Sequence, residues 1–154
     1  MTNQVSGRPI EILLVEDTAA DVRLTLEVLK DGRVNNSVSV ARDGVEAMAF
    51  LRKQGDYANA PHPDIILLDL NLPRKDGREI LAELKEDPDL RRIPVVVLTV
   101  SKAEEDIFRS YDLGVNSYVA KPVTFVALVE VIKTLGIYWF KIVELPPNSA
   151  PVEK

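Results

Sequence analysis

Five short strand-like runs lie along the chain, and an amphipathic segment follows each of them. Three of these runs are mainly aliphatic, as buried strands are, while the second alternates serine and valine and the fifth is short. The five runs fall at residues 10–15, 37–41, 64–69, 93–100 and 116–120. Strand followed by helix, five times over, predicts an α/β domain with one open parallel sheet and helices on both faces.

The segments between the runs repeat apolar residues at helical spacing, with glycines or prolines where helices should end. One helix is expected to begin at Asp17 or Thr18, and another to cover residues 102–113. The positions expected on the buried helix faces are Val22, Leu26, Leu29, Val45, Met48, Leu51, Ile80, Leu81, Leu84, Phe125, Leu128, Val129 and Ile132.

Polar residues stand where four of the five runs end. Glu16 and Asp17 follow the first run, Asp69 ends the third, Thr99 lies near the end of the fourth, and Lys121 follows the fifth. In open parallel sheets, sites form beyond the carboxyl ends of the strands. We therefore expect these five side chains, far apart in the sequence, to meet at one edge.

Three carboxylates at one edge repel each other unless a cation joins them. Hard oxygen ligands in a small cluster suit Mg²⁺. An ammonium and a hydroxyl beside them would suit a phosphoryl group, and a carboxylate such as Asp69 can act as the nucleophile that forms an acyl phosphate. Any one of the acids could instead be a helix cap or a solvated strand end. Five polar groups at one edge argue against that for the whole set.

Composition excludes several further classes of function. The chain has 154 residues and 46% apolar residues, enough for one domain with a complete core. A formal net charge of −5 argues against nucleic-acid binding, and the absence of cysteine excludes disulfides and thiol catalysis. We see no signal peptide and no apolar run of roughly 18 residues, so no membrane association and a cytoplasmic location are expected.

Several motifs in order resemble the receiver domains of two-component response regulators, the CheY type. They are LLVED (13–17), LLDLNLP (67–73), DG (76–77), VVLTVS (96–101) and SYVAKP (117–122). The resemblance covers residues 9–136, after a polar N-terminal segment at 1–8. It implies a (βα)5 flavodoxin-like fold with the strand order 2-1-3-4-5.

The resemblance also implies a role for each residue of the edge. Asp69 would accept a phosphoryl group from a sensor histidine kinase, so the protein would signal rather than turn over a substrate as an enzyme does. Asp17, Asp69 and the backbone carbonyl of Asn71 would bind Mg²⁺, with Mn²⁺ as a substitute, and Glu16 would reach the metal through water. The residues implied to act on the phosphoryl group or to switch are Thr99, Lys121 and Tyr118, and the Lys121–Pro122 peptide would be cis.

Val100 departs from that pattern, because the residue after the threonine is commonly small in this family. Its bulk could restrict access to Asp69.

A hydrophobic and then proline-rich extension follows at residues 137–154. We expect its apolar side chains either to pack on their own domain or to form a dimer or partner surface. The residues expected in that surface are Tyr138, Trp139, Phe140, Val143 and Leu145. The extension and the segment EDTAADVRL resemble the Rcp-type regulators that partner bacterial phytochromes, which implies a phytochrome-type kinase and a homodimer.

Three other functions compete with the phosphorylation switch. A haloacid-dehalogenase phosphatase would need a second acid two residues after the nucleophile, where this chain has Asn71, and the acidic EDTAAD segment would repel the phosphate of a flavodoxin's FMN. A receiver-like binding module that is never phosphorylated usually lacks one of the site residues, and all are present here.

Overall fold

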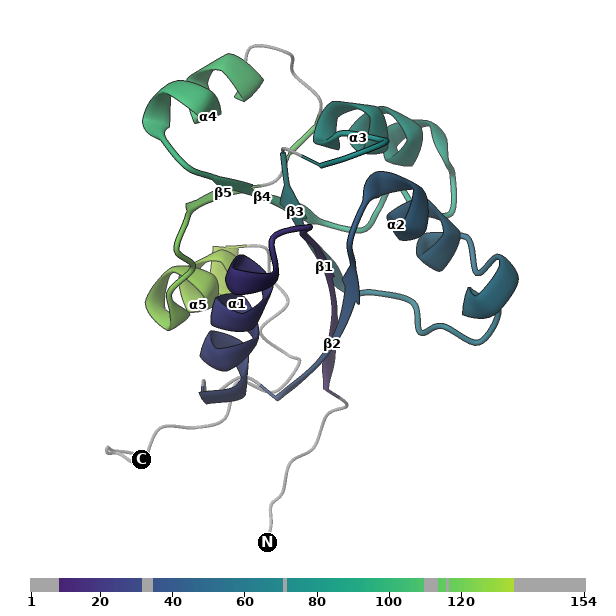
Figure 1. The fold of residues 1–154 in the computed structure, drawn as a ribbon, viewed down its shortest axis with the longest axis horizontal. Helices are drawn as coiled ribbons and strands as arrows, with labels where there is room; N and C mark the ends of the chain where they lie inside the picture. Colours follow the sequence, from purple (N-terminus) through teal and green to yellow (C-terminus); the bar gives the residue numbers. More distant parts are fainter. Residues whose placement is uncertain (1–8, 32–34, 71, 110–113, 116, 135–154) are drawn as a thin grey trace, which may run out of the picture.

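The computed structural model describes residues 9–31, 35–70, 72–109, 114–115 and 117–134. Five parallel strands form one sheet in the order β2-β1-β3-β4-β5. The strands are β1 (Ile10–Val15), β2 (Asn36–Ala41), β3 (Ile65–Asp69), β4 (Val95–Thr99) and β5 (Ser117–Ala120). This confirms the flavodoxin-like fold and its strand order (Figure 1).

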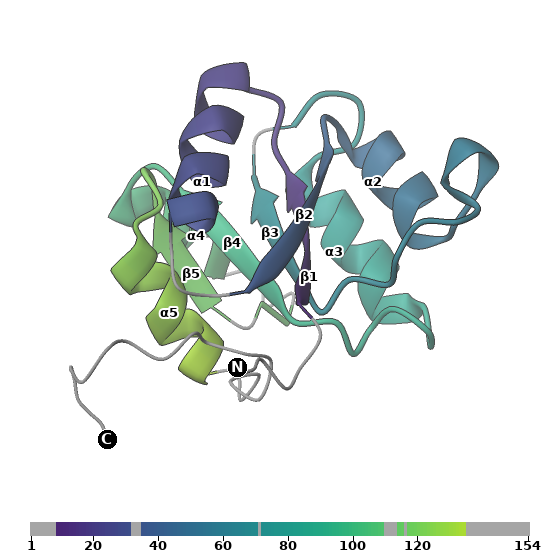
Figure 2. The same ribbon diagram turned by 90° about the horizontal axis from the view of Figure 1, so that it is seen from below.

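Helices cover both faces of the sheet, as the strand–helix alternation predicts. They are α1 (Ala19–Asp31), α2 (Gly44–Leu51), α3 (Gly77–Glu86), α4 (Lys102–Arg109) and α5 (Phe125–Thr134), with a short 3-10 turn, η1, at Gly55–Tyr57. α1 and α5 lie on one face, while α2, α3 and α4 lie on the other (Figures 1 and 2).

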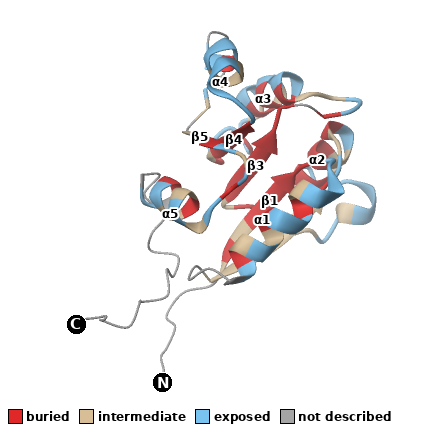
Figure 3. Cartoon of the chain, turned by 60° about the vertical axis from the view of Figure 1, so that its left-hand side comes forward, coloured by how far each residue is buried: buried red, intermediate tan, exposed pale blue. Residues whose placement is uncertain are grey.

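Each strand sends alternate residues into two separate cores. In β3, Ile65 and Leu67 pack with Leu128 of α5 on one face, whereas Ile66 and Leu68 pack with Ile80 of α3 on the other. Because β3 and β4 are buried along their whole length, their sequences are continuously aliphatic rather than alternating (Figure 3).

Most of the expected helix faces are buried, with one clear error. Val45 is 44% exposed, because α2 turns Ala47, Met48 and Leu51 toward the sheet instead. Leu26, Phe125 and Val129 are only partly buried. α4 ends at Arg109; residues 110–113 and the side chain of Ile132 lie outside the described part.

Across the described residues, no helix combines the length and the apolarity needed to cross a membrane.

Candidate functional site

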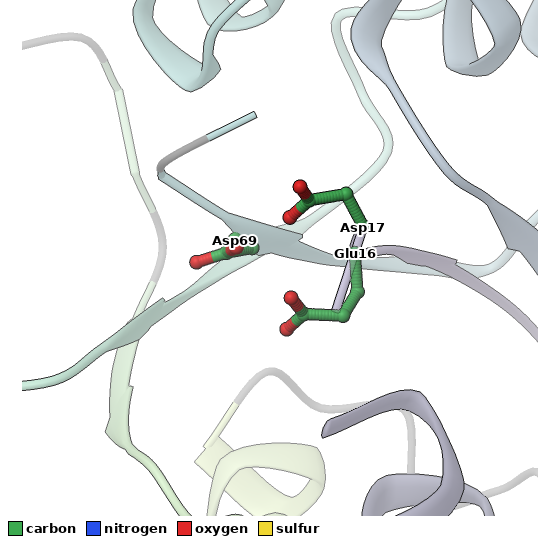
Figure 4. A group of neighbouring side chains, drawn as sticks. All are labelled: Glu16, Asp17 and Asp69. Carbon is green, nitrogen blue, oxygen red and sulfur yellow. The ribbon is translucent and has the colours of Figure 1, made fainter. Parts of the chain in front are cut away.

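The carboxyl ends of β1 and β3 bring three acidic side chains together. Glu16 and Asp17 directly follow β1, and Asp69 is the last residue of β3, which pairs with β1 in parallel. Carboxylate oxygens of all three lie within 4.8 Å of one another (Figure 4). The sequence-based prediction that these acids converge on one edge is therefore seen in the structure.

The three acids differ in burial. Glu16 is 1% exposed and Asp69 5% exposed, while Asp17 is open to solvent. Successive strand residues point to opposite faces, so Glu16 and Asp17 extend in different directions from the end of β1 (Figure 4). The cluster therefore has a buried base and a solvent-facing side.

Lys121, just beyond β5, places its ammonium among the carboxylates. Its Nζ lies 2.8 Å from Oε1 of Glu16, 3.2 Å from Oδ1 of Asp69 and 3.1 Å from Oδ2 of Asp21. Asp21, in the first turn of α1, was not predicted as a site residue. The acidic EDTAAD segment, which carries Asp21 one turn after Asp17, was the available signal.

The protonation of these groups follows from the same contacts. Burial, together with the nearby charge of Asp69, raises the pKa of Glu16 above its ordinary value although Lys121 acts in the opposite direction. Burial works against the charge of Lys121, yet the surrounding Glu16, Asp69 and Asp21 carboxylates outweigh it and raise the pKa of Lys121. The lysine is therefore charged throughout the physiological pH range.

Both carboxylate oxygens of the buried Glu16 have partners at the site. Oε2 of Glu16 accepts the backbone N–H of Thr18 at 3.3 Å. Oε1 pairs with the ammonium of Lys121 at 2.8 Å. Three carboxylates within 4.8 Å of one another, with Asp17 open to solvent, fit a hard divalent cation.

Thr99 completes the edge from β4. It is buried, and its carbonyl oxygen accepts the backbone N–H of Lys121 at 2.7 Å. That bond ties the end of β4 to the residue that carries the site's ammonium. The Lys121–Pro122 peptide is cis, as the resemblance implied.

Tyr118, a residue of β5, packs against α4. Its ring meets that of Phe108 edge-on with a centroid separation of 6.4 Å, and the Arg109 guanidinium carbon lies 4.0 Å from its ring centroid. Burial raises the pKa of its phenol, so the ring is neutral at physiological pH. Tyr118 is half-buried, and it connects β5 to α4.

Two groups of predicted site residues fall outside the described part of the chain. They are Asn71, expected to offer a carbonyl to the metal, and the expected interface residues Tyr138, Trp139, Phe140, Val143 and Leu145. The side chain of Val100 is 64% exposed, and its effect on access to Asp69 stays a prediction.

Comparison with known proteins gives a consistent result. The family model for the response regulator receiver domain matches residues 12–133. Response regulator Rcp1 of Synechocystis sp. is 52% identical over 141 residues, which cover 92% of this chain and 96% of that protein.

Solved structures of response regulators are similar to this chain in both fold and sequence. The bacteriophytochrome response regulator AtBRR superimposes with a TM-score of 0.82 at 47% identity, covering 89% of this chain and 99% of that one. The Mn²⁺-bound form of Rcp1 gives a TM-score of 0.69 at 52% identity, over 90% and 99% of the two chains. The phosphorylated cyanobacterial phytochrome response regulator RcpA gives 0.70 at 54% identity, over the same shares.

Proposed function

The chain belongs to the response regulator receiver family, and we propose that within it Asp69 accepts a phosphoryl group from the phosphohistidine of a sensor histidine kinase. The observation that carries this proposal is the position of Lys121 Nζ, 3.2 Å from Oδ1 of Asp69 and beside two further carboxylates. A carboxylate held next to an ammonium and a potential metal site can receive a phosphoryl group whose negative charge is neutralised on arrival.

The transfer is a displacement at phosphorus. An oxygen of the Asp69 carboxylate forms the new P–O bond while the P–N bond to the donor imidazole breaks, and that bond's electron pair leaves with the imidazole nitrogen. Lys121 pairs with the phosphoryl oxygens, and the hydroxyl of Thr99 donates a hydrogen bond to them.

We propose Asp17 and Asp69 as direct ligands of Mg²⁺, or of Mn²⁺ in its place, with Glu16 acting through water and the carbonyl of Asn71 completing the set. When bound, the ion supplies positive charge to the phosphoryl oxygens. The three clustered carboxylates support this assignment, as does the Mn²⁺-bound form of the relative Rcp1.

The kinase is proposed to be of the phytochrome type. Support comes from relatives described as phytochrome and bacteriophytochrome response regulators. We place the receiver at residues 9–136 and the signalling event in the cytoplasm. The readout is a change in protein association, with Tyr118 as the switch side chain between the site and α4.

Intact-mass measurement after treatment with acetyl phosphate tests the proposal. We expect one phosphoryl adduct in Mg²⁺, little or none in EDTA, and none in Asp69→Asn. The exposed carboxylate variant Asp89→Asn is the matched control and should label as the wild type does.

A folded wild type that takes no label in Mg²⁺ would exclude the phosphorylation switch. The alternative would then stand: a receiver-like module that binds proteins without being phosphorylated.

A further inference from the structure

A carboxylate of α4 holds the peptide group that follows Thr99. The backbone N–H of Val100 donates to Oε1 of Glu104 at 2.9 Å, and the backbone N–H of Glu104 donates to Oγ of Ser101 at 3.0 Å. These reciprocal bonds resemble a capping box, shifted by one residue. They fix the loop between β4 and α4 in one position.

That loop borders the proposed phosphoryl site. Asp69 pairs in register with Leu98, so the peptide groups after Leu98 lie beside the end of β3. The backbone N–H of Ile66 in β3 donates to the carbonyl of Pro94. Because the backbone N–H and C=O groups of successive strand residues point to opposite sides, the even-numbered residues of β4 direct these groups toward β3. Val100, one residue past the end of β4, is the next even-numbered residue, so this alternation places its N–H on the side of Asp69.

We propose that Glu104 is a positioning residue that opposes phosphorylation of Asp69, an inference that rests on the proposed function. In the unphosphorylated protein its carboxylate occupies the N–H of Val100. A phosphoryl group on Asp69 carries up to two negative charges and strong acceptor oxygens. It competes for that N–H and repels the carboxylate, so the bond between Val100 and Glu104 breaks when Asp69 is phosphorylated.

The surroundings of Glu104 leave room for this change. An open pocket of about 520 Å³ lies beside Glu104 between α3 and α4; Val100, Ser101, Glu104 and Phe108 are among the residues that line it. Among the described residues of α4, only Phe108 is buried. Few apolar contacts therefore hold α4 against the sheet, so its first turn can move without disrupting a large apolar contact.

Breaking the bond between Val100 and Glu104 would affect Tyr118, the proposed switch residue, through α4. Phe108 lies one turn after Glu104, and its ring contacts Tyr118 edge-on. Movement of the first turn of α4 therefore changes the packing of Tyr118, the residue proposed to report the state of the site.

The test compares acetyl phosphate labelling of the wild type, Glu104→Gln and Asp106→Asn, all with Mg²⁺. Glutamine can still accept the N–H of Val100 but does not repel the phosphoryl group. Couplings between two sites commonly begin at about fivefold, and we expect Glu104→Gln to raise the ratio of labelling rate to label-loss rate by about that factor. Asp106→Asn removes the same charge from the same helix, where the carboxylate pairs with Lys102, and should match the wild type.

An NMR measurement supplies a readout that a purely structural role would not move. The amide of Val100 should show a large shift when the wild type is treated with beryllofluoride, a phosphoryl mimic, and a smaller difference between states in Glu104→Gln. Wild-type labelling with no change in Glu104→Gln would overturn the role of Glu104. A wild type that takes no label would overturn the proposed function, and this inference with it.

Discussion

Lys121 is the cation that allows acidic side chains to share one edge of the sheet. Glu16 is almost fully buried, and Lys121 pairs with it, with Asp69 and with Asp21. Removing one partner of a buried ion pair leaves an uncompensated charge, which costs about 3 kcal/mol. We expect Lys121→Met to lower the free energy of unfolding by about that amount in EDTA, as measured by urea denaturation.

The same variant should regain part of its stability in Mg²⁺, because the ion then replaces the lost positive charge. The gain on adding Mg²⁺ should be larger in Lys121→Met than in the wild type. Equal gains would mean that the lysine and the metal site are independent.

Tyr57 makes a contact that depends on pH at the alkaline end. Its hydroxyl donates to Oε2 of Glu46, and this bond, with burial and the carboxylate's charge, raises the pKa of Tyr57 to about 12. The folded state therefore favours the protonated phenol. The resulting stabilisation is complete below the unfolded pKa of about 10 and is lost as the pH rises toward 12.

Tyr57→Phe removes this contribution. We expect the wild type to melt at a higher temperature than Tyr57→Phe at pH 8, and the difference to shrink as the pH rises from 10 to 12. Thermal melts monitored by circular dichroism at several pH values measure it. A difference that stays constant over that range would contradict the assignment to the phenol proton.

Prediction from sequence succeeded for residues that stand at strand ends. Glu16, Asp17, Asp69 and Lys121 could be placed because parallel strands carry their carboxyl ends to one edge. Asp21 could not, because its reach to Lys121 depends on where the first turn of α1 lies relative to the loop after β5, which a strand-by-strand pattern does not encode.

At the level of elements, the start of α2 is locked to the loop before α3. Asp43 accepts the N–H of Glu46 as the helix cap and pairs with Arg74 at 2.6 Å. Gly44 lies so close to this loop that an added Cβ would stand 2.1 Å from the carbonyl oxygen of Lys75. Only glycine fits there, because the obstacle is backbone rather than a movable side chain.

Gly44→Ala should therefore destabilise the protein by about 3 kcal/mol, the upper range for overpacking. Gly55→Ala is the matched control, since Gly55 has open space around its Cβ position and only a left-handed φ of 58°, which costs about 1 kcal/mol. Urea denaturation of both variants measures the difference. Equal losses would show that the loop yields to the added methyl group.

Sequence patterns predicted the positions of the strands more accurately than the buried faces of the helices. The sequence patterns placed all five strands to within a few residues. The pattern is clearest for β3 and β4, which are buried along their whole length and carry continuous aliphatic runs, whereas β2 alternates serine and valine. Helix faces were less certain. Val45 was expected inside but lies outside, since four other apolar side chains of α2, namely Ala47, Met48, Phe50 and Leu51, are buried instead.

At the scale of the whole molecule, the strand order sets which polar ends become neighbours. β1 and β3 are adjacent, so Glu16, Asp17 and Asp69 share one site although more than fifty positions separate the first from the last. Strand–helix alternation predicted the parallel sheet, but the order 2-1-3-4-5 came from family resemblance. Local periodicity does not specify how the strands are arranged.

The C-terminal extension is the segment expected to mediate association between two copies of the chain. Residues 137–145 contain seven apolar or aromatic side chains, including the single tryptophan of the chain. Aromatic residues anchor many interfaces, and such a stretch left in water would be an unusually apolar patch. We expect the wild type to sediment as a dimer and the double variant Trp139→Ser/Phe140→Ser to sediment as a monomer at the same concentration.

Acetyl phosphate labelling of the double variant separates this prediction from the switch. Because Asp69 and its neighbours all precede the extension, labelling should match that of the wild type. Lys141→Ala, within the same stretch, should remain dimeric. Sedimentation before and after phosphorylation then shows whether association responds to Asp69. A double variant that stays dimeric would instead favour packing of the extension on its own domain and would require a different dimer surface.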